Sequence, residues 1–200
     1  MDENLNDIAW QGKSWRLRVT RRTLSDGSIH ESAYIDHPGS VVIVPWRESD
    51  LGSEVLMLRQ YRYSIRDAIL ELPAGTRGWD EDLLVCAQRE LREETGFRAK
   101  RFIHLGQYWP APGVTNEEMN VYLALGLQYD PLPQDLDEEI EVVAYGLDDL
   151  FDMATDGRLS DAKSVVGILR TAFYLQISPF NKENSNAATK KDNSCQNTEA

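Results

Sequence analysis

The sequence predicts one α/β domain in which a mixed sheet lies between helices, with an antiparallel β appendage at the N-terminus. The chain has 200 residues, enough for one ordinary domain with a small appendage. Strand-like and helix-like segments follow one another without a regular βαβ alternation. The longest strongly apolar run, residues 41–46, is far too short to span a membrane and is typical of a buried strand.

The first sixty residues are expected to form four strands, because turn-favouring residues separate apolar or alternating runs at 15–24, 29–35, 41–46 and 54–60. Asp26-Gly27 joins the first two runs, which predicts an antiparallel hairpin. His37-Pro38-Gly39 then breaks the chain and separates an appendage, residues 1–36, from the main domain. Residues 49–53 are expected to form the loop between the last two strands.

The clearest helix covers residues 82–95, where Leu84, Ala87 and Leu91 recur at helical spacing and Gly96 follows as a helix-ending glycine. Further strands are expected at 101–108, 119–127 and 140–146, and further helices at 147–155 and 162–175. The main domain is therefore placed at residues 37–180. Residues 181–200 contain no Leu, Ile, Val or aromatic residue, so this tail is expected to be disordered.

Charge and cysteine content exclude some classes of protein. A net charge of -12 argues against binding of a nucleic-acid backbone, because nucleic-acid-binding proteins concentrate Lys and Arg. A small phosphorylated substrate remains compatible, since a metal and a few arginines can hold it. Cys86 and Cys195 are too few for a disulfide framework, and the N-terminus shows no secretory signal. The chain is expected to be cytoplasmic, with no membrane partner.

Glu90, Glu93 and Glu94 carry the strongest chemical signal. Their i, i+3, i+4 spacing places three carboxylates on one helix face, where like charges repel by roughly 0.2–0.5 kcal/mol per pair. They also crowd the end of the helix, where the macrodipole disfavours anions. A cation removes both penalties, and oxygen ligands suit Mg²⁺ or Mn²⁺ rather than zinc. The alternative is a solvated helix face on which Arg89 and Arg92 pair with the acids.

The segment from Gly75 to Phe97 resembles a complete Nudix box, since every fixed position is filled: Gly75, Glu81, Arg89, Glu90, Leu91, Glu93, Glu94, Gly96 and Phe97. The resemblance implies a Nudix-type α/β/α sandwich. It also implies an enzyme that uses two or three divalent ions to cleave a diphosphate linked to another moiety.

The same resemblance implies individual roles. The metal ligands would be the carbonyl of Ala74 and the carboxylates of Glu90, Glu93 and Glu94, with Glu93 also serving catalysis by holding a water. Arg89 would orient an acid of the cluster and Glu81 would tie the loop to the helix, with plain structural support as the alternative for both. The metals would lower the pKa of a bound water. A carboxylate outside the box would then take the water's proton.

Flanking segments resemble the ADP-ribose pyrophosphatase branch of the family over roughly residues 15–175, at 37–39, 58–63, 70–75 and 108–113. Pro112 stands fifteen residues past Phe97. The implied reaction converts ADP-ribose to AMP and ribose 5-phosphate. GDP-mannose or another nucleotide sugar is the alternative, because the box recognises phosphates and metals rather than base or sugar. A Nudix domain that senses a nucleotide without catalysis is the alternative from a different class.

The branch also implies substrate contacts and a proton acceptor. Arg62 is expected to grip a phosphate bidentately, or else to be a strand-edge arginine paired with an acid. Glu71 is expected near the metal edge of the site, and Pro112 beside the substrate. The proton acceptor is expected in the acidic loop 136–142, with Glu138 as first choice and Glu139 as second.

Relatives of this branch use an N-terminal appendage like residues 1–36 to form a homodimer, in which both subunits build each substrate site. We therefore expect a homodimer through this region. The alternative is a monomer whose hairpin folds on its own domain.

Overall fold

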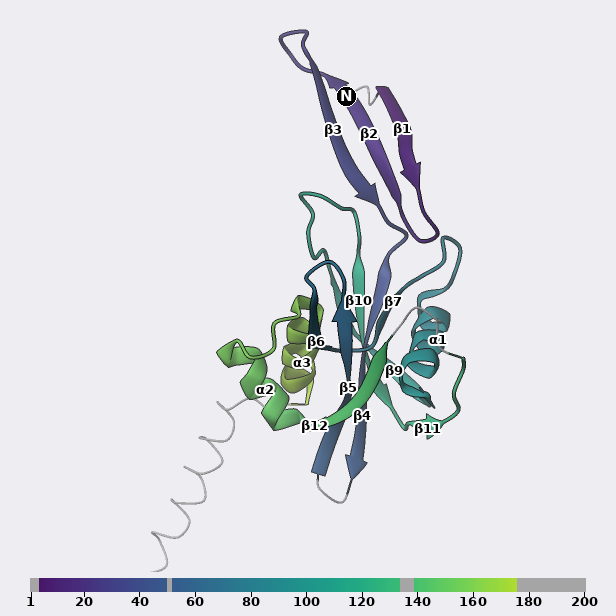
Figure 1. The fold of residues 1–200 in the computed structure, drawn as a ribbon, viewed down its shortest axis with the longest axis vertical. Coiled ribbons are helices and arrows are strands. Elements are labelled where there is room, and N and C mark those ends of the chain that lie inside the picture. The colour runs from purple at the N-terminus through teal and green to yellow at the C-terminus, as the bar shows by residue number, and fades with distance from the viewer. Residues whose placement is uncertain (1–3, 50–51, 134–138, 176–200) are drawn as a thin grey trace, which may run out of the picture.

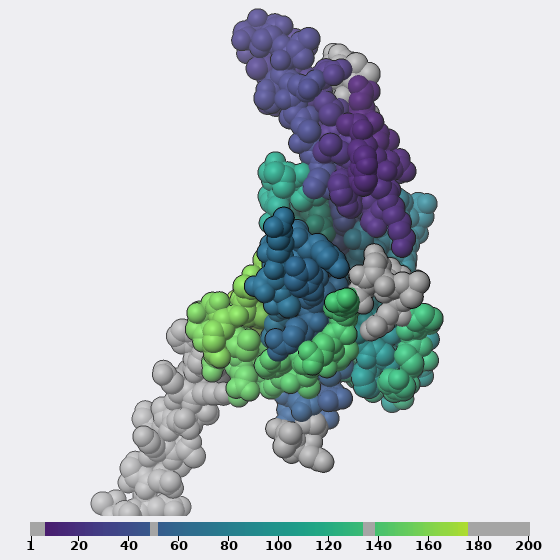
Figure 2. All heavy atoms as spheres, in the orientation of Figure 1, coloured from purple at the N-terminus to yellow at the C-terminus, as the bar shows by residue number. Residues whose placement is uncertain are grey.

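The computed structural model describes residues 4–49, 52–133 and 139–175, which form a small N-terminal sheet and an α/β body (Figure 1). The N-terminal sheet is antiparallel and consists of β1 (Asn4–Gln11), β2 (Arg16–Thr23) and β3 (Ile29–Asp36). The predicted hairpin corresponds to β2 and β3. β1 is an additional strand, which the sequence signals weakly because Asn and Asp are depleted in strands. Figure 2 shows the sheet standing out from the rest of the surface.

The body contains a mixed sheet, as predicted, and this sheet has seven strands within the described residues. Five strands follow the order β12-β5-β4-β10-β9, while β6 pairs with β5 and β7 pairs with β4. β4 and β10 run parallel, and the other neighbours are antiparallel. The strands are β4 (Ser40–Ser49), β5 (Gly52–Arg62), β6 (Asp67–Glu71), β7 (Ala74–Thr76), β9 (Arg101–Tyr108), β10 (Met119–Leu125) and β12 (Ile140–Gly146). A separate short ladder joins β8 (Phe97–Arg98) to β11 (Gln128–Tyr129).

The predicted loop at 49–53 is too long. Ser49 pairs with Gly52 and Glu48 pairs with Ser53, so both strands continue almost to the turn. Backbone pairing extends the strands past the polar residues that indicated a loop. Gly52 adopts a φ of 109°, which glycine tolerates better than other residues.

The sheet lies between helices on both sides, so the predicted sandwich is confirmed. α1 (Leu83–Thr95) covers one face, and α2 (Leu147–Asp156) and α3 (Ala162–Tyr174) cover the other (Figure 1). Alternate residues of β4 enter two separate cores: Val41 and Ile43 pack with Leu91 of α1, whereas Val42 and Val44 pack with Ile168 of α3. Burial on both faces explains why this strand is continuously apolar.

Helix α1 has the ends that the sequence predicts. The Asp82 side chain accepts hydrogen bonds from the amides of Leu84 and Val85 at 2.8 and 3.3 Å, which caps the N-terminus. Gly96 ends the helix with a φ of 78°, and its N–H donates to the carbonyl of Arg92 at 3.1 Å. Within the described ranges, no helix is long and apolar enough to cross a membrane.

Candidate active site

The backbone at Gly75 approaches helix α1 very closely. A Cβ on this residue would lie 1.9 Å from Cδ of Glu90 and 2.0 Å from its Oε1. Any larger side chain would therefore displace the Glu90 carboxylate. The neighbouring Ala74 donates its N–H to Oε2 of Glu94 at 2.9 Å, and Glu94 is only 4% exposed. Strand β7 and the acidic face of α1 are thus held together at this point.

Arg89 is the centre of a network of acids. Its Nε and Nη2 donate to the two carboxylate oxygens of Glu81 at 2.9 and 3.0 Å. Its Nη1 donates to Glu90 at 2.7 Å and to Glu93 at 2.9 Å. The hydrogen bond from Arg89 lowers the pKa of Glu81 to about 2, and the same bond raises the pKa of Arg89. Glu81 also accepts the N–H of Gly78 at 2.8 Å, so it links the loop before α1 to the helix.

The acids fit a hard divalent cation. Nη1 of Arg89 occupies the position between Glu90 and Glu93 where a positive charge is required. The donor atoms are carboxylate oxygens, which suit Mg²⁺ or Mn²⁺. In the part of the chain that the structure describes, no three acid, His or Cys side chains are already gathered as a metal site. Arg89 is the cation that pairs with Glu90 and Glu93 in the described structure.

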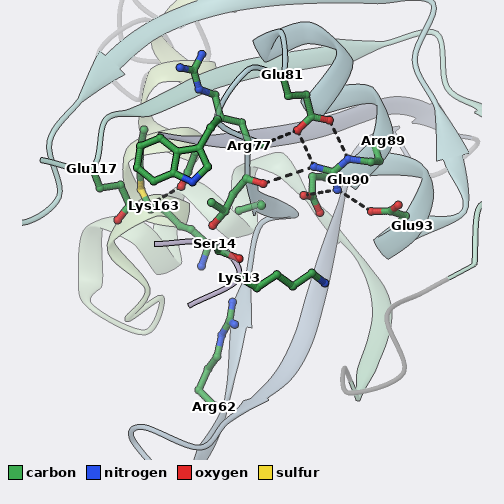
Figure 3. Close-up of a pocket in the computed structure, with 17 residues that line it drawn as sticks. Lys13, Ser14, Arg62, Arg77, Glu81, Arg89, Glu90, Glu93, Glu117 and Lys163 are labelled. Carbon is green, nitrogen blue, oxygen red and sulfur yellow. Dashed lines mark hydrogen bonds and ion pairs between the residues drawn. The ribbon is translucent and has the colours of Figure 1, made fainter. Parts of the chain in front are cut away.

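A pocket of about 550 Å³ opens beside this network (Figure 3). Its lining includes seven residues that the sequence indicated: Arg62, Ala74, Gly75, Glu81, Arg89, Glu90 and Glu93. Glu94 is not in the lining, because it is buried behind Ala74. The lining also includes residues that the sequence reading missed: Lys13, Ser14, Arg77, Trp79, Glu117 and Lys163. These residues come from four separated segments. Arg77 and Trp79 lie at positions that the box leaves unspecified, and the others lie in no local motif that could have revealed them.

Glu71, which is expected near the metal edge of the site, is buried and pairs with two cations that line the pocket. It is 1% exposed, and its two oxygens accept hydrogen bonds from Nε and Nη2 of Arg62 at 2.6 and 2.7 Å. Lys163 of α3 forms an ion pair with the same carboxylate and a second one with Asp161 at 3.0 Å. Burial alone would raise the pKa of Glu71, but Arg62 and Lys163 outweigh it and lower the pKa. Glu71 is therefore ionised and fixes two cations that face the pocket.

The remaining predicted residues lie elsewhere. Pro112 lines a second hollow of about 380 Å³ together with Tyr34, Trp109, Thr115 and Asn116. Glu139 is exposed and directly precedes β12. Glu138 and the tail at 181–200 lie outside the described residues.

Comparison with known proteins agrees with this geometry. A sequence profile of the NUDIX domain matches residues 36–166. The chain therefore belongs to the Nudix family, and it is a Nudix hydrolase. It is 29% identical over 170 residues to an ADP-ribose pyrophosphatase of Bacillus subtilis, covering 84% of this chain and 88% of that protein. The same identity and coverage relate it to a methanol dehydrogenase activator of Bacillus methanolicus.

The solved structure of an ADP compounds hydrolase has the same fold. It matches with a TM-score of 0.73 and 20% sequence identity, over 88% of this chain and 94% of that one.

Proposed function

We propose that this chain hydrolyses the diphosphate bridge of a nucleoside-diphosphate sugar in a Mg²⁺-dependent reaction, with ADP-ribose as the preferred substrate. One observation carries the proposal: the complete box places Glu90 and Glu93 on one wall of the pocket, while Arg62 and Lys163 line another part of it (Figure 3). Acids on one side can bind metal, and cations on the other can bind phosphate. The ADP-ribose pyrophosphatases among the relatives support this choice of substrate.

Glu90, Glu93, Glu94 and the carbonyl of Ala74 would hold two or three Mg²⁺ ions, with Mn²⁺ as the alternative. Bound metal supplies charge neutralisation for the diphosphate and lowers the pKa of a coordinated water. With a metal on Glu90 and Glu93, the two hydrogen bonds to Glu81 would still hold the Arg89 side chain in place. Arg62 would then face a phosphate, since its pairing with Glu71 leaves Nη1 for a ligand.

A carboxylate that is not a metal ligand must take the proton of the attacking water. We propose Glu138 for this role and Glu139 as the second choice. The support is their position: Glu139 directly precedes β12, and β12 pairs with β5, the strand that ends at Arg62. A segment beside the substrate-binding strand can bring an acid to the pocket.

The test is a substrate panel with Mg²⁺ and identified products, with EDTA as the control. ADP-ribose should give AMP and ribose 5-phosphate, and EDTA should abolish the reaction. A wide preference for GDP-mannose would favour the alternative supported by a GDP-mannose pyrophosphatase of Cronobacter sakazakii, which is 26% identical over 159 residues. Tight nucleotide binding without hydrolysis would indicate a sensing domain instead.

We also propose that the chain forms a homodimer through its N-terminal sheet. This sheet carries exposed apolar side chains that a second copy could cover: Ile8, Trp10, Leu24 and Ile29 are 46, 49, 38 and 71% exposed. A cytoplasmic location is part of the same proposal, and the free thiol of buried Cys86 supports it.

A further inference from the structure

We propose that Ser164 is a positioning residue of the site, which holds the backbone at 71–74 so that the carbonyl of Ala74 keeps its place as a metal ligand. The inference rests on the proposed function in taking this carbonyl as a ligand. Ser164 lies in the first turn of α3 and is fully buried. It is outside the lining of the pocket, so it would act through the backbone and not on the substrate.

The connection between β6 and β7, residues 72 and 73, lies outside both strands. Pro73 has no N–H, so the N–H of Leu72 is the backbone donor of this connection. Leu72 is 1% exposed, and a buried N–H without a partner is costly. Oγ of Ser164 accepts this N–H at 2.6 Å, while the carbonyl of Pro73 accepts the N–H of Ile43 in β4 at 2.8 Å. Two hydrogen bonds therefore fix the backbone that leads directly into Ala74.

The hydroxyl of Ser164 is itself oriented by the cap of α3. Oδ2 of Asp161 accepts the N–H of Ser164 at 3.1 Å and its hydroxyl at 2.5 Å. Because the single hydroxyl proton goes to Asp161, the lone pairs of Oγ are left to accept the N–H of Leu72. The same carboxylate oxygen pairs with Lys163 at 3.0 Å. The first turn of α3 thus presents an acceptor of fixed orientation to the connection.

Helix α3 also approaches the connection through its side chains (Figure 1). A Cβ on Gly167, one turn after Ser164, would lie 2.5 Å from Cδ1 of Leu72, so only glycine permits this approach. Lys163 forms an ion pair with Glu71, the last residue of β6. A shift of the start of α3 would therefore be passed on to the backbone that precedes Ala74.

Ala74 is held between two helices by these contacts. On the side of α1 its N–H donates to Oε2 of Glu94 at 2.9 Å, and on the side of α3 Ser164 holds Leu72, two residues earlier. Contacts that orient a metal ligand without touching the metal typically contribute about 10- to 100-fold to metal affinity. Ser164 makes a contact of this kind, although it lies far from the Nudix box in sequence.

The experiment measures the dissociation constant of Mn²⁺ for the full chain without substrate. Electron paramagnetic resonance detects the free ion, and the melting temperature of each variant is recorded beside it. Ser164→Ala should raise the dissociation constant about 10-fold, at the lower end of the range, because Ser164 acts through two residues of backbone. Ser164→Cys should change it in the same direction, since a thiol is a weak acceptor. The cysteine variant leaves a smaller gap in the core and serves as the test where Ser164→Ala does not fold.

Two control variants on α3 separate positioning from stability. Thr171→Val removes a buried hydroxyl that lies two turns further along the helix and has no hydrogen-bond partner among the described residues. Ile168→Val removes a methylene group from the core and should lower the melting temperature. Both variants should bind Mn²⁺ as the wild type does. In ADP-ribose kinetics, Ser164→Ala should need about 10-fold more Mg²⁺ for half-activation, and its kcat at saturating Mg²⁺ should approach that of the wild type.

An unchanged Mn²⁺ dissociation constant in the Ser164 variants would overturn the proposal. An equal change in Ile168→Val would overturn it too, because lost stability would then explain the effect, and so would a wild type that does not bind Mn²⁺. Weaker Mn²⁺ binding by Ser164→Ala, in a protein whose wild type hydrolyses no nucleotide sugar, would retain Ser164 as a positioning residue while removing the proposed function. The two proposals can therefore fail separately.

Discussion

At the scale of residues, Glu90, Glu93 and Glu94 have different surroundings, although their helical spacing places all three on one face. Glu90 and Glu93 share Nη1 of Arg89 at the pocket, whereas Glu94 is buried and bonded to the amide of Ala74. Glu94 therefore holds β7, the strand in which the carbonyl of Ala74 would be a metal ligand. A helical periodicity places acids on one face, but only the packed strand decides which of them is buried.

Glu94→Gln tests the metal assignment. The glutamine carbonyl can still accept the N–H of Ala74, so the fold should be kept, while the negative charge that a metal requires is lost. We expect kcat to fall by about 10²-fold or more, with an unchanged circular dichroism spectrum and weaker Mg²⁺ activation. Glu48→Gln, an exposed acid on β4, is the control. Near-full activity of Glu94→Gln would show that the metal assignment is wrong.

The proton acceptor is tested by Glu138→Gln and Glu139→Gln side by side. A positioned general base contributes about 10²–10⁴-fold in rate. Glu138→Gln should therefore lower kcat by that order with little change in KM or Mg²⁺ affinity, and Glu139→Gln should be mild. Steady-state kinetics check both variants. Reversed results would assign the base to Glu139, and two fast variants would remove this loop from the mechanism.

Lys163 shows why part of the site could not be predicted from the sequence. Its position in the pocket depends on an ion pair with Glu71, a residue 92 positions away on β6. The sequence around Lys163 indicates only a helix, and in the structure Asp161 caps its start. Contacts between a helix and a strand that are distant in the chain follow from packing, which local patterns do not contain.

At the scale of elements, β7 approaches α1 so closely at Gly75 that no side chain fits between them without moving Glu90. Gly75→Ala places a methyl group within 2.4 Å of the Glu90 carboxylate atoms, so that carboxylate must move. We expect a loss of metal-dependent turnover of at least 10-fold, because box acids need positions fixed to about 0.5 Å. Gly113→Ala is the matched control, since its Cβ would meet nothing within 4 Å. Equal kinetics of the two variants would contradict this role for Gly75.

Elements with strong local signals could be predicted from the sequence, and short ones could not. Helix α1 has both caps and a regular apolar spacing, and β4 has a continuous apolar run. β7, β8 and β11 have only two or three residues each, so they are defined by their pairing rather than by a pattern. The apolar alternation of β2 and β3 predicted a hairpin, while the polar sequence of β1 concealed the third strand.

At the scale of the whole molecule, the N-terminal sheet carries exposed apolar side chains on its surface and also contributes a turn to the lining of the pocket. The end of β3 is fixed to the body: Asp36 accepts a hydrogen bond from Asn116 at 3.0 Å, and the N–H of Ile35 donates to the carbonyl of Val114 at 2.9 Å. The turn between β1 and β2 lies at the same end of the sheet and presents Lys13 to the pocket. The sequence indicated an appendage but could not place it, because no local pattern encodes its contacts with the body.

Removal of residues 1–36 should abolish dimerisation and turnover together, for two different reasons. The dimer is lost because the exposed apolar sheet is removed. Turnover is lost because the turn between β1 and β2, which lines the pocket, and the Arg16–Trp79 contact are removed. The double substitution Ile8→Lys and Ile29→Lys separates these effects: it should give a monomer that keeps turnover, since both side chains are exposed and outside the pocket lining. Sedimentation and ADP-ribose kinetics check both proteins. A full-length wild type that is monomeric and fully active would remove the dimer from the proposal, and a truncated chain that remains active would remove the sheet from the site.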